Sequence, residues 1–212
     1  MIKGIITGDI VDSSIIPNEW KSKISETLNK VISDFRKQSL ANIEMFRGDS
    51  FQIIVEKPSS ALAIGIALRA ALRANTPENL PPWDARISIG IGDVSFESES
   101  ILTSDGEAFH LSGREFDVLG KRRIAISTSH KELNTELKLP TAFADEFITK
   151  WTPRQAEVVY AGLIDDTSQK EMAESLGMKL SNFNKHWNLA HVGLIQLYIA
   201  RFEELITNNY TL

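Results

Sequence analysis

Residues 3–11 read KGIITGDIV, a short run rich in β-branched side chains that predicts a buried strand. Asp9, near the end of this run, is the exception to its apolar character. An ionised carboxylate within an apolar strand costs free energy unless it is paired with a cation or bound to a metal. Asp9 is therefore the first candidate functional residue.

The segments that follow predict a mixed fold. Apolar residues from Trp20 to Phe35 recur at steps of 4, 4, 3 and 4, which is one face of a helix. Residues 47–49 read RGD and predict a tight turn between two strands. The βαββαβ order that results is typical of a ferredoxin-like palm, an antiparallel sheet with helices on one face. The predicted strands are 3–11, 42–46, 50–55, 86–94 and 123–127, and the predicted helices are 20–35, 59–74 and 106–119.

The sequence changes character after Pro140. Residues 141–150 predict a connecting helix, and Thr152-Pro153 begins another, because proline favours the first helical position. Helices over 155–163 and 168–176, a turn at Gly177 and a long helix from Ser181 have the spacing of a helix-turn-helix. We expect an α+β chain with a ferredoxin-like palm domain over residues 1–138 and a small all-α helix-turn-helix domain over residues 139–212.

Composition excludes several classes of site. The 212 residues carry a net charge of −5 and no cysteine, so disulfides, thiolate zinc sites and cysteine nucleophiles are excluded. The first residues lack the charged start and long apolar stretch of a signal peptide, and no apolar run has the length of a membrane helix. We therefore expect a cytoplasmic protein with no membrane partner, whose DNA binding would depend on a local patch.

Asp49, in the predicted turn, is a second candidate carboxylate. The first strand and the hairpin are neighbours in a palm fold, so Asp9 and Asp49 would converge at one edge of the sheet. Divalent ions such as Mg²⁺ prefer oxygen ligands, and two metals held there can activate a hydroxyl and stabilise a leaving pyrophosphate. Asp49 taken alone is equally well explained as a turn residue.

A series of segments resembles the class III nucleotidyl cyclases, in the same order along the chain. They are TGDIVDS at 7–13, RGDSF at 47–51, RISIGIG at 86–92, GEAFHLSGR at 106–114 and IAIS at 124–127. The resemblance implies that Asp9 and Asp49, helped by the carbonyl of Ile10, hold Mg²⁺ or Mn²⁺.

The same resemblance implies a site for a nucleoside triphosphate. Arg114 stands where the cyclases carry the arginine that stabilises the transition state, and Gly48, Ser50 and Thr103 would contact the nucleotide. The sequence departs from the cyclases at His110, where they carry asparagine, and at Met45, where they carry a base-reading lysine. Arg114 and His110 also fit an ordinary solvated arginine and a structural histidine.

Two segments of the tail resemble LuxR-type and sigma-region-4-type DNA-binding domains. WTPRQAEVV at 151–159 is similar to their first helix, and SQKEMAESLGM at 168–178 to their second helix and turn. The resemblance implies a recognition helix from about Ser181. The residues expected in the major groove are Asn182, Asn184, Lys185 and His186. The residues expected to contact phosphates are Ser168, Gln169, Lys170 and Lys179.

The charge of the tail limits such binding. Residues 151–212 hold five Lys or Arg and seven Asp or Glu, a net charge of −2. Phosphate contacts dominate DNA affinity, so one copy would bind weakly and a second copy would add avidity. A helical bundle that contacts proteins is the alternative. A series of residues from Leu180 to Leu205, apolar except for Arg201, steps by 3 or 4, which fits either a dimer seam or burial against the palm.

The whole layout resembles the SatD family of bacterial proteins. Our leading interpretation is a homodimeric DNA-binding transcriptional regulator whose cyclase-like palm binds a nucleotide with Mg²⁺ or Mn²⁺. One alternative is a metal-dependent nucleotidyl cyclase or nucleotidyltransferase. Another is a catalytically inactive platform for dimerisation or protein contacts.

Overall fold

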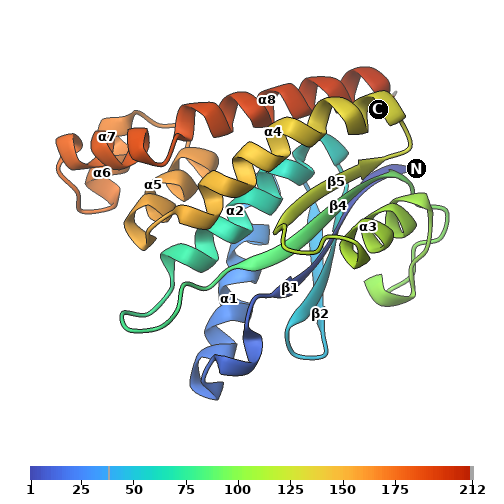
Figure 1. The fold of residues 1–212 in the computed structure, drawn as a ribbon, viewed down its shortest axis with the longest axis horizontal. Helices are drawn as coiled ribbons and strands as arrows, with labels where there is room; N and C mark the ends of the chain where they lie inside the picture. Colours follow the sequence, from blue (N-terminus) through green and yellow to red (C-terminus); the bar gives the residue numbers. More distant parts are fainter. Residues whose placement is uncertain (38, 211–212) are drawn as a thin grey trace.

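The computed structural model describes residues 1–37 and 39–210. The first six regular elements follow the predicted order of strand, helix, strand, strand, helix and strand. Helices surround one sheet in a mixed α+β fold (Figure 1). The strands are β1 (Ile2–Ile10), β2 (Ala41–Phe46), β3 (Ser50–Val55), β4 (Ala85–Asp93) and β5 (Ile124–Thr128). The α-helices are α1 (Asn18–Asp34), α2 (Ala61–Ala74), α3 (Glu107–Asp117), α4 (Lys131–Lys150), α5 (Pro153–Ile164), α6 (Gln169–Ser175), α7 (Leu180–Leu189) and α8 (Val192–Asn209).

The sheet has the strand order β2-β3-β1-β4-β5, with β1 at its centre. The pairs among β1, β2, β3 and β4 are antiparallel, whereas β4 and β5 are parallel. The prediction of an antiparallel sheet is therefore confirmed for the first four strands and wrong for β5. The reason is that α3 forms a crossover between β4 and β5, which returns the chain in the same direction.

The two faces of the sheet are covered by different helices. Ile6 and Ile10 of β1 lie in the main core with α1 and α2, while Ile5 lies in a smaller cluster beneath α3. A Cβ on Gly90 of β4 would come within 2.2 Å of the carbonyl oxygen of Ala108, so glycine allows α3 to approach closely. The expectation that helices cover only one face is therefore wrong.

Helix α4 begins ten residues earlier than predicted, at Lys131 rather than at residue 141, and Pro140 lies inside it. Proline removes one backbone hydrogen bond, but the apolar face of the helix continues across it. The buried side chains keep helical spacing through the proline, and they are Leu133, Leu137, Thr141, Ala144 and Ile148. Packing of this face explains why the helix does not stop.

The predicted single helix from Ser181 is instead two helices, α7 and α8. His191 adopts the left-handed conformation with φ of 56°, which ends one helix and starts the next. Nε1 of the buried Trp151 donates a hydrogen bond to the carbonyl oxygen of Ala190 at 3.0 Å. This tertiary contact satisfies a carbonyl that the break would otherwise leave without a partner.

Helix α8 has one buried and one exposed apolar side. Its buried residues include Ile195 and Phe202, which belong to a core cluster shared with α1, α2 and the sheet. Leu194 and Leu197 remain exposed.

The predicted boundary between residues 138 and 139 falls inside α4. Despite the length of α8, no helix within residues 1–37 and 39–210 is both long and apolar enough to cross a membrane.

A buried ionic network ties the sheet to α2 and α4. Arg69 of α2 and Asp84 are both 0% exposed, and the Arg69 guanidinium donates to both Asp84 oxygens at 2.8 and 3.0 Å. Arg123 also donates to Asp84 at 2.7 Å, and Arg69 reaches Asp145 of α4 at 2.7 Å. Burial alone would raise the pKa of Asp84, but the surrounding arginines outweigh it and hold that pKa below its usual range.

Candidate functional site

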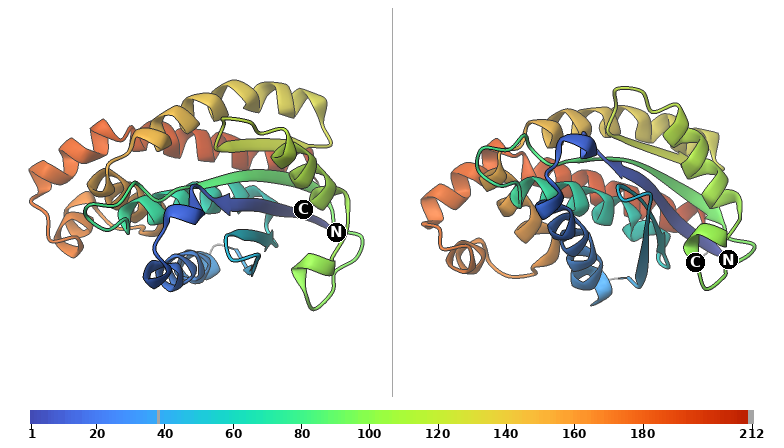
Figure 2. Two further views of the ribbon diagram at one scale, coloured as in Figure 1. Left: turned by 60° about the horizontal axis from the view of Figure 1, so that its bottom comes forward. Right: turned by 90° about the horizontal axis from the view of Figure 1, so that it is seen from below.

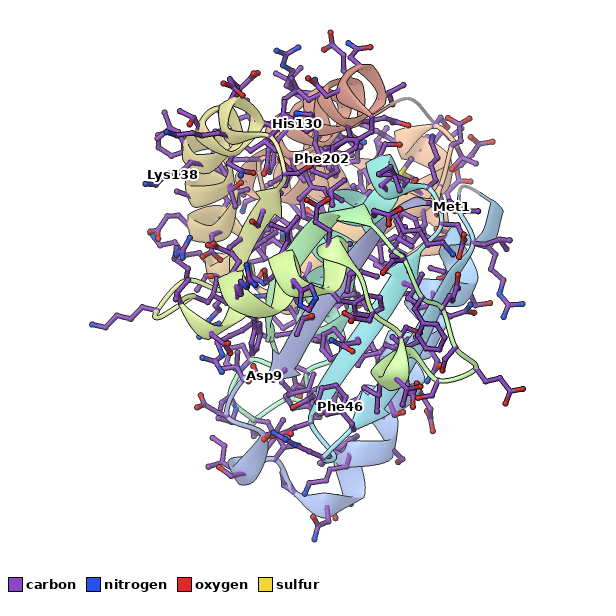
Figure 3. All side chains as sticks on the ribbon, turned by 90° about the vertical axis from the view of Figure 1, so that its right-hand side faces the viewer. Met1, Asp9, Phe46, His130, Lys138 and Phe202 are labelled. Atoms are coloured by element: carbon purple, nitrogen blue, oxygen red, sulfur yellow. The ribbon has the colours of Figure 1, made fainter. Side chains whose placement is uncertain are left out.

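The end of β1 and the β2–β3 turn lie side by side, as predicted. Asp9 is the register partner of Ser50, and the N–H of Ile10 donates to the carbonyl oxygen of Asp49 at 3.0 Å. Arg47 and Gly48 both have positive φ, 54° and 85°, which closes the turn tightly. Figure 3 shows Asp9 near Phe46 at this end of the sheet, far from Met1 at the other.

Asp9 already has a cationic partner, which sequence reasoning missed. Nε and Nη2 of Arg86 donate to its two carboxylate oxygens at 3.0 and 2.6 Å. The Arg86 guanidinium also lies 5.4 Å from the centre of the Phe116 ring, and hydrogen bonding to Asp9 raises its pKa. The signal that could have found this pair is the register of two antiparallel strands, which places Arg86 opposite Asp9.

Asp49 is engaged differently. The Ser13 hydroxyl donates to its Oδ2 at 2.6 Å, and the Ser50 hydroxyl lies 3.4 Å from its Oδ1. A pocket of about 110 Å³ adjoins this carboxylate, between the turn and the start of α1. Its polar lining is Ser13, Ser14, Lys21, Arg47 and Asp49.

The two carboxylates do not form a closed metal site. Within residues 1–37 and 39–210, no group of three or more His, Cys, Asp or Glu side chains is arranged to hold a metal ion. Asp49 and the hydroxyls beside it are the oxygen donors that Mg²⁺ prefers, and they fit a metal bound together with phosphate. Asp9 fits this donor set only where Arg86 has moved away, because a cation would otherwise lie beside the guanidinium.

The remaining predicted ligands of the palm are dispersed. Arg114 is exposed on α3, and within the described part of the chain it makes no hydrogen bond or ion pair. Nε2 of His110 lies 3.1 Å from Asp105, just before α3. At that end of α3, Gly106 packs against Asp93, whose partner on β1 is Ile2 rather than Asp9.

The residues predicted to contact the nucleotide are likewise dispersed. The Thr103 hydroxyl shares a hydrogen bond with Ser98 in the loop before α3. Met45 packs against the main core, so it leaves no polar group at the position of the base-reading lysine. Gly48 and Ser50 lie beside Asp49, while His110 and Thr103 contact neither carboxylate.

Helices α5, α6 and α7 form a second candidate site. The side chains of Thr152 and Ser168 cap α5 and α6, each in a reciprocal capping box with the residue three positions on. Gly177, with φ of +63°, makes the turn into α7, and the N–H of Met178 donates to the carbonyl oxygen of Ala173 at 2.8 Å. The buried residues that hold the three helices together include Ala156, Val159, Met172, Ala173 and Phe183.

Most of the predicted DNA contacts are exposed, and two are half-buried. Asn184 and His186 are half-buried, and Asn184 Oδ1 and His186 Nδ1 are shielded from solvent with no hydrogen-bond partner among the described residues. The cause is helical spacing, since both flank the packed aromatic residues Phe183 and Trp187. The predicted residues that are exposed are Ser168, Gln169, Lys170, Lys179, Asn182 and Lys185.

The exposed face of α7 also includes two residues that sequence reasoning missed, Ser181 and Asn188. Together with Asn182 and Lys185 they form one face of the helix. Counting the helical period from the buried Phe183 would have predicted that this face is exposed. Ser168 is exposed, but its hydroxyl is used locally, because it donates to Glu171 at 2.7 Å and accepts from the Glu171 N–H.

Comparisons with known proteins bear on this chain in three ways. No curated protein matches it. Among solved structures, it is similar to a bacterial light-regulated adenylyl cyclase, with a TM-score of 0.42 and 16% identity over 59% of this chain and 74% of that one. The model of the SatD family matches residues 4–203. The chain therefore belongs to the SatD family.

Proposed function

We propose that this SatD-family protein is a regulator that binds DNA through α7, with α6 lying across the phosphate backbone. The observation that carries the proposal is the exposed polar face of α7, formed by Ser181, Asn182, Lys185 and Asn188 on a compact three-helix unit. A helix presented in this way fits the major groove, and asparagine and lysine are side chains that read base edges.

The start of α6 supports the same orientation. Gln169 and Lys170 are exposed in its first turn, and Lys179 is exposed just before α7. Both positions would face phosphates when α7 enters the groove. The net charge of −2 over residues 151–212 keeps the number of such contacts small, so affinity per copy is expected to be low.

Salt dependence provides the test. We expect the logarithm of the association constant to fall linearly with the logarithm of salt concentration, with a slope of roughly −0.9 for each phosphate neutralised. Lys170→Ala should reduce the magnitude of that slope by about 1 while leaving the preferred sequence unchanged. Fluorescence anisotropy of the full chain on labelled duplexes measures both, with the exposed Lys121→Ala as the control. Binding that is insensitive to salt would contradict the proposal.

A second proposal concerns the palm, where we infer that a nucleoside triphosphate binds with Mg²⁺ or Mn²⁺ beside Asp49. The supporting observation is the pocket next to this carboxylate, which combines the hydroxyls of Ser13 and Ser14 with the cations of Lys21 and Arg47. Phosphate oxygens suit the cations and hydroxyls, and the metal suits the carboxylate. Occupation of this pocket would be the signal that alters DNA binding.

The ion pair of Asp9 with Arg86 makes the palm proposal testable. Removing the guanidinium frees the Asp9 carboxylate, which the proposal places within reach of the metal, so Arg86→Gln should increase metal-dependent stabilisation by nucleotide, whereas Asp49→Asn should abolish it. Thermal unfolding with nucleoside triphosphates and Mn²⁺ measures this, because a ligand at 100 times its dissociation constant adds about 2.7 kcal/mol. An unchanged curve for the wild type and for Arg86→Gln would contradict it. Product formation would instead identify the cyclase or nucleotidyltransferase alternative.

A further inference from the structure

Helices α4 and α8 lie side by side on the outside of the molecule and expose an apolar face (Figures 1 and 2). They run antiparallel, since Glu136 near the start of α4 pairs with Arg201 in the second half of α8. Four large side chains stand out from this α4–α8 face, namely Leu139, Phe143, Leu194 and Leu197, with exposed fractions of 63%, 57%, 54% and 67%. A groove of about 490 Å³ lies between the two helices, and its lining is predominantly apolar.

These exposed side chains are not needed for the core. The opposite sides of the same helices carry buried residues such as Leu137 and Ala144 on α4 and Ile195 and Phe202 on α8. Contiguous apolar patches of this kind on a protein surface mark an interaction site. The partner must therefore be apolar where it meets this face.

We propose that the α4–α8 face is the contact between two copies of this chain. Self-association needs a surface that carries both projections and a matching recess, because a two-fold axis places the same patch on both sides. The α4–α8 face has both, since Phe143 and Leu197 project beside the groove that they help to line.

The charges around this face favour a second copy over a charged partner. The exposed charged residues of α4 balance one another, as Lys131, Lys138 and Lys150 match Glu132, Glu136 and Glu146. Arg201 on α8 is held within the chain by Glu136 at 2.7 Å and Glu204 at 2.8 Å. Two copies of a chain with net charge −5 repel each other overall, but the charges on this face balance, so they do not oppose contact between two copies of it.

The size of the face also fits a dimer contact. At 20 and 18 residues, α4 and α8 are roughly 30 and 27 Å long, and side by side they are roughly 20 Å wide. The footprint is about 600 Å², close to the approximately 800 Å² that each partner buries in an interface of standard size. This inference stands independently of DNA binding.

The sequence has no cysteine, so a single introduced cysteine would be the only thiol and could be cross-linked selectively. The proposal places Leu197, the most exposed of the four apolar residues, near the two-fold axis, where a residue approaches its own copy. We therefore expect Leu197→Cys to give a covalent dimer in high yield with a short bismaleimide linker at micromolar protein. Val118→Cys is the matched control, since Val118 is equally exposed at 68% but lies at the end of α3. Equal yields from the two variants would overturn the proposal.

Sedimentation provides the complementary measurement. We expect the wild type to sediment as a dimer of twice 23.7 kDa. Leu197→Glu, with an unchanged far-UV circular dichroism spectrum as evidence of folding, should sediment as a monomer. Val118→Glu should remain dimeric. A wild type that is monomeric at 50 µM, or a dimer that survives both Leu197→Glu and Phe143→Glu, would overturn the proposal. Either result would leave DNA binding by single copies as a separate question for the anisotropy measurement.

Discussion

Asp84→Asn is expected to lower the free energy of unfolding by about 3–5 kcal/mol, the usual cost of removing one partner from a buried ion pair. Within the described residues, Asp84 is the only acidic group that pairs with the guanidinium groups of both Arg69 and Arg123, and neither it nor Arg69 is exposed. Without the carboxylate, the guanidinium of Arg69 keeps Asp145 as its only ionic partner among the described residues. The melting temperature should fall by about 6–20 °C for a chain of this length.

Circular dichroism during thermal and urea unfolding measures this loss. Lys57→Ala is the control, because Lys57 and Glu203 form an ion pair that is nearly half exposed on both sides and should contribute less than about 1 kcal/mol. The pKa of Asp84 is depressed in the folded state, so its contribution is present above the unfolded pKa and is lost as the pH falls through the folded one. Asp84→Asn should therefore weaken the acid dependence of stability. A loss of stability no larger than that of Lys57→Ala would contradict this role.

Asn182→Ala combined with Lys185→Ala is expected to cause the largest loss of DNA affinity. Each side chain is exposed on α7, one helical turn from the other, and each base contact of this kind contributes about 1–3 kcal/mol. A single replacement should therefore weaken binding by roughly 5- to 150-fold, and the double replacement by more. Titration of each variant against the preferred duplex and against a scrambled duplex measures affinity and specificity together.

The matched control lies on the same helix. Asn184→Ala alters a half-buried residue beside Phe183, so it should change DNA affinity less than Asn182→Ala does. Full-strength, sequence-specific binding by the double variant would exclude α7 as the reading helix.

Sequence patterns predicted the elements whose cause is local. The strand from residue 3 follows from its run of β-branched residues, and the hairpin follows from the turn at Gly48, where positive φ suits glycine. The break between α7 and α8 could not be predicted, because it depends on Trp151 reaching Ala190 across 39 positions. The early start of α4 was also missed, since Pro140 alone suggests a helix boundary.

The candidate sites show the same limit. The proximity of Asp9 to the hairpin followed from the palm topology, but its pairing with Arg86 depends on the register of strands 77 positions apart. On α7, the resemblance located the helix, whereas the period measured from Phe183 determines which side chains are exposed. That period also explains why Asn184 and His186 are half-buried, since they flank the packed residues Phe183 and Trp187.

Selection from a random duplex library with the full-length protein tests the central claim most directly. We expect enrichment of a defined motif, bound at least about 1,000-fold more tightly than unrelated DNA at physiological salt, as is usual for specific recognition. The enrichment should be lost with Asn182→Ala and Lys185→Ala. A library that stays unenriched through successive rounds, with protein shown to be folded and dimeric, would contradict the claim that α7 reads DNA.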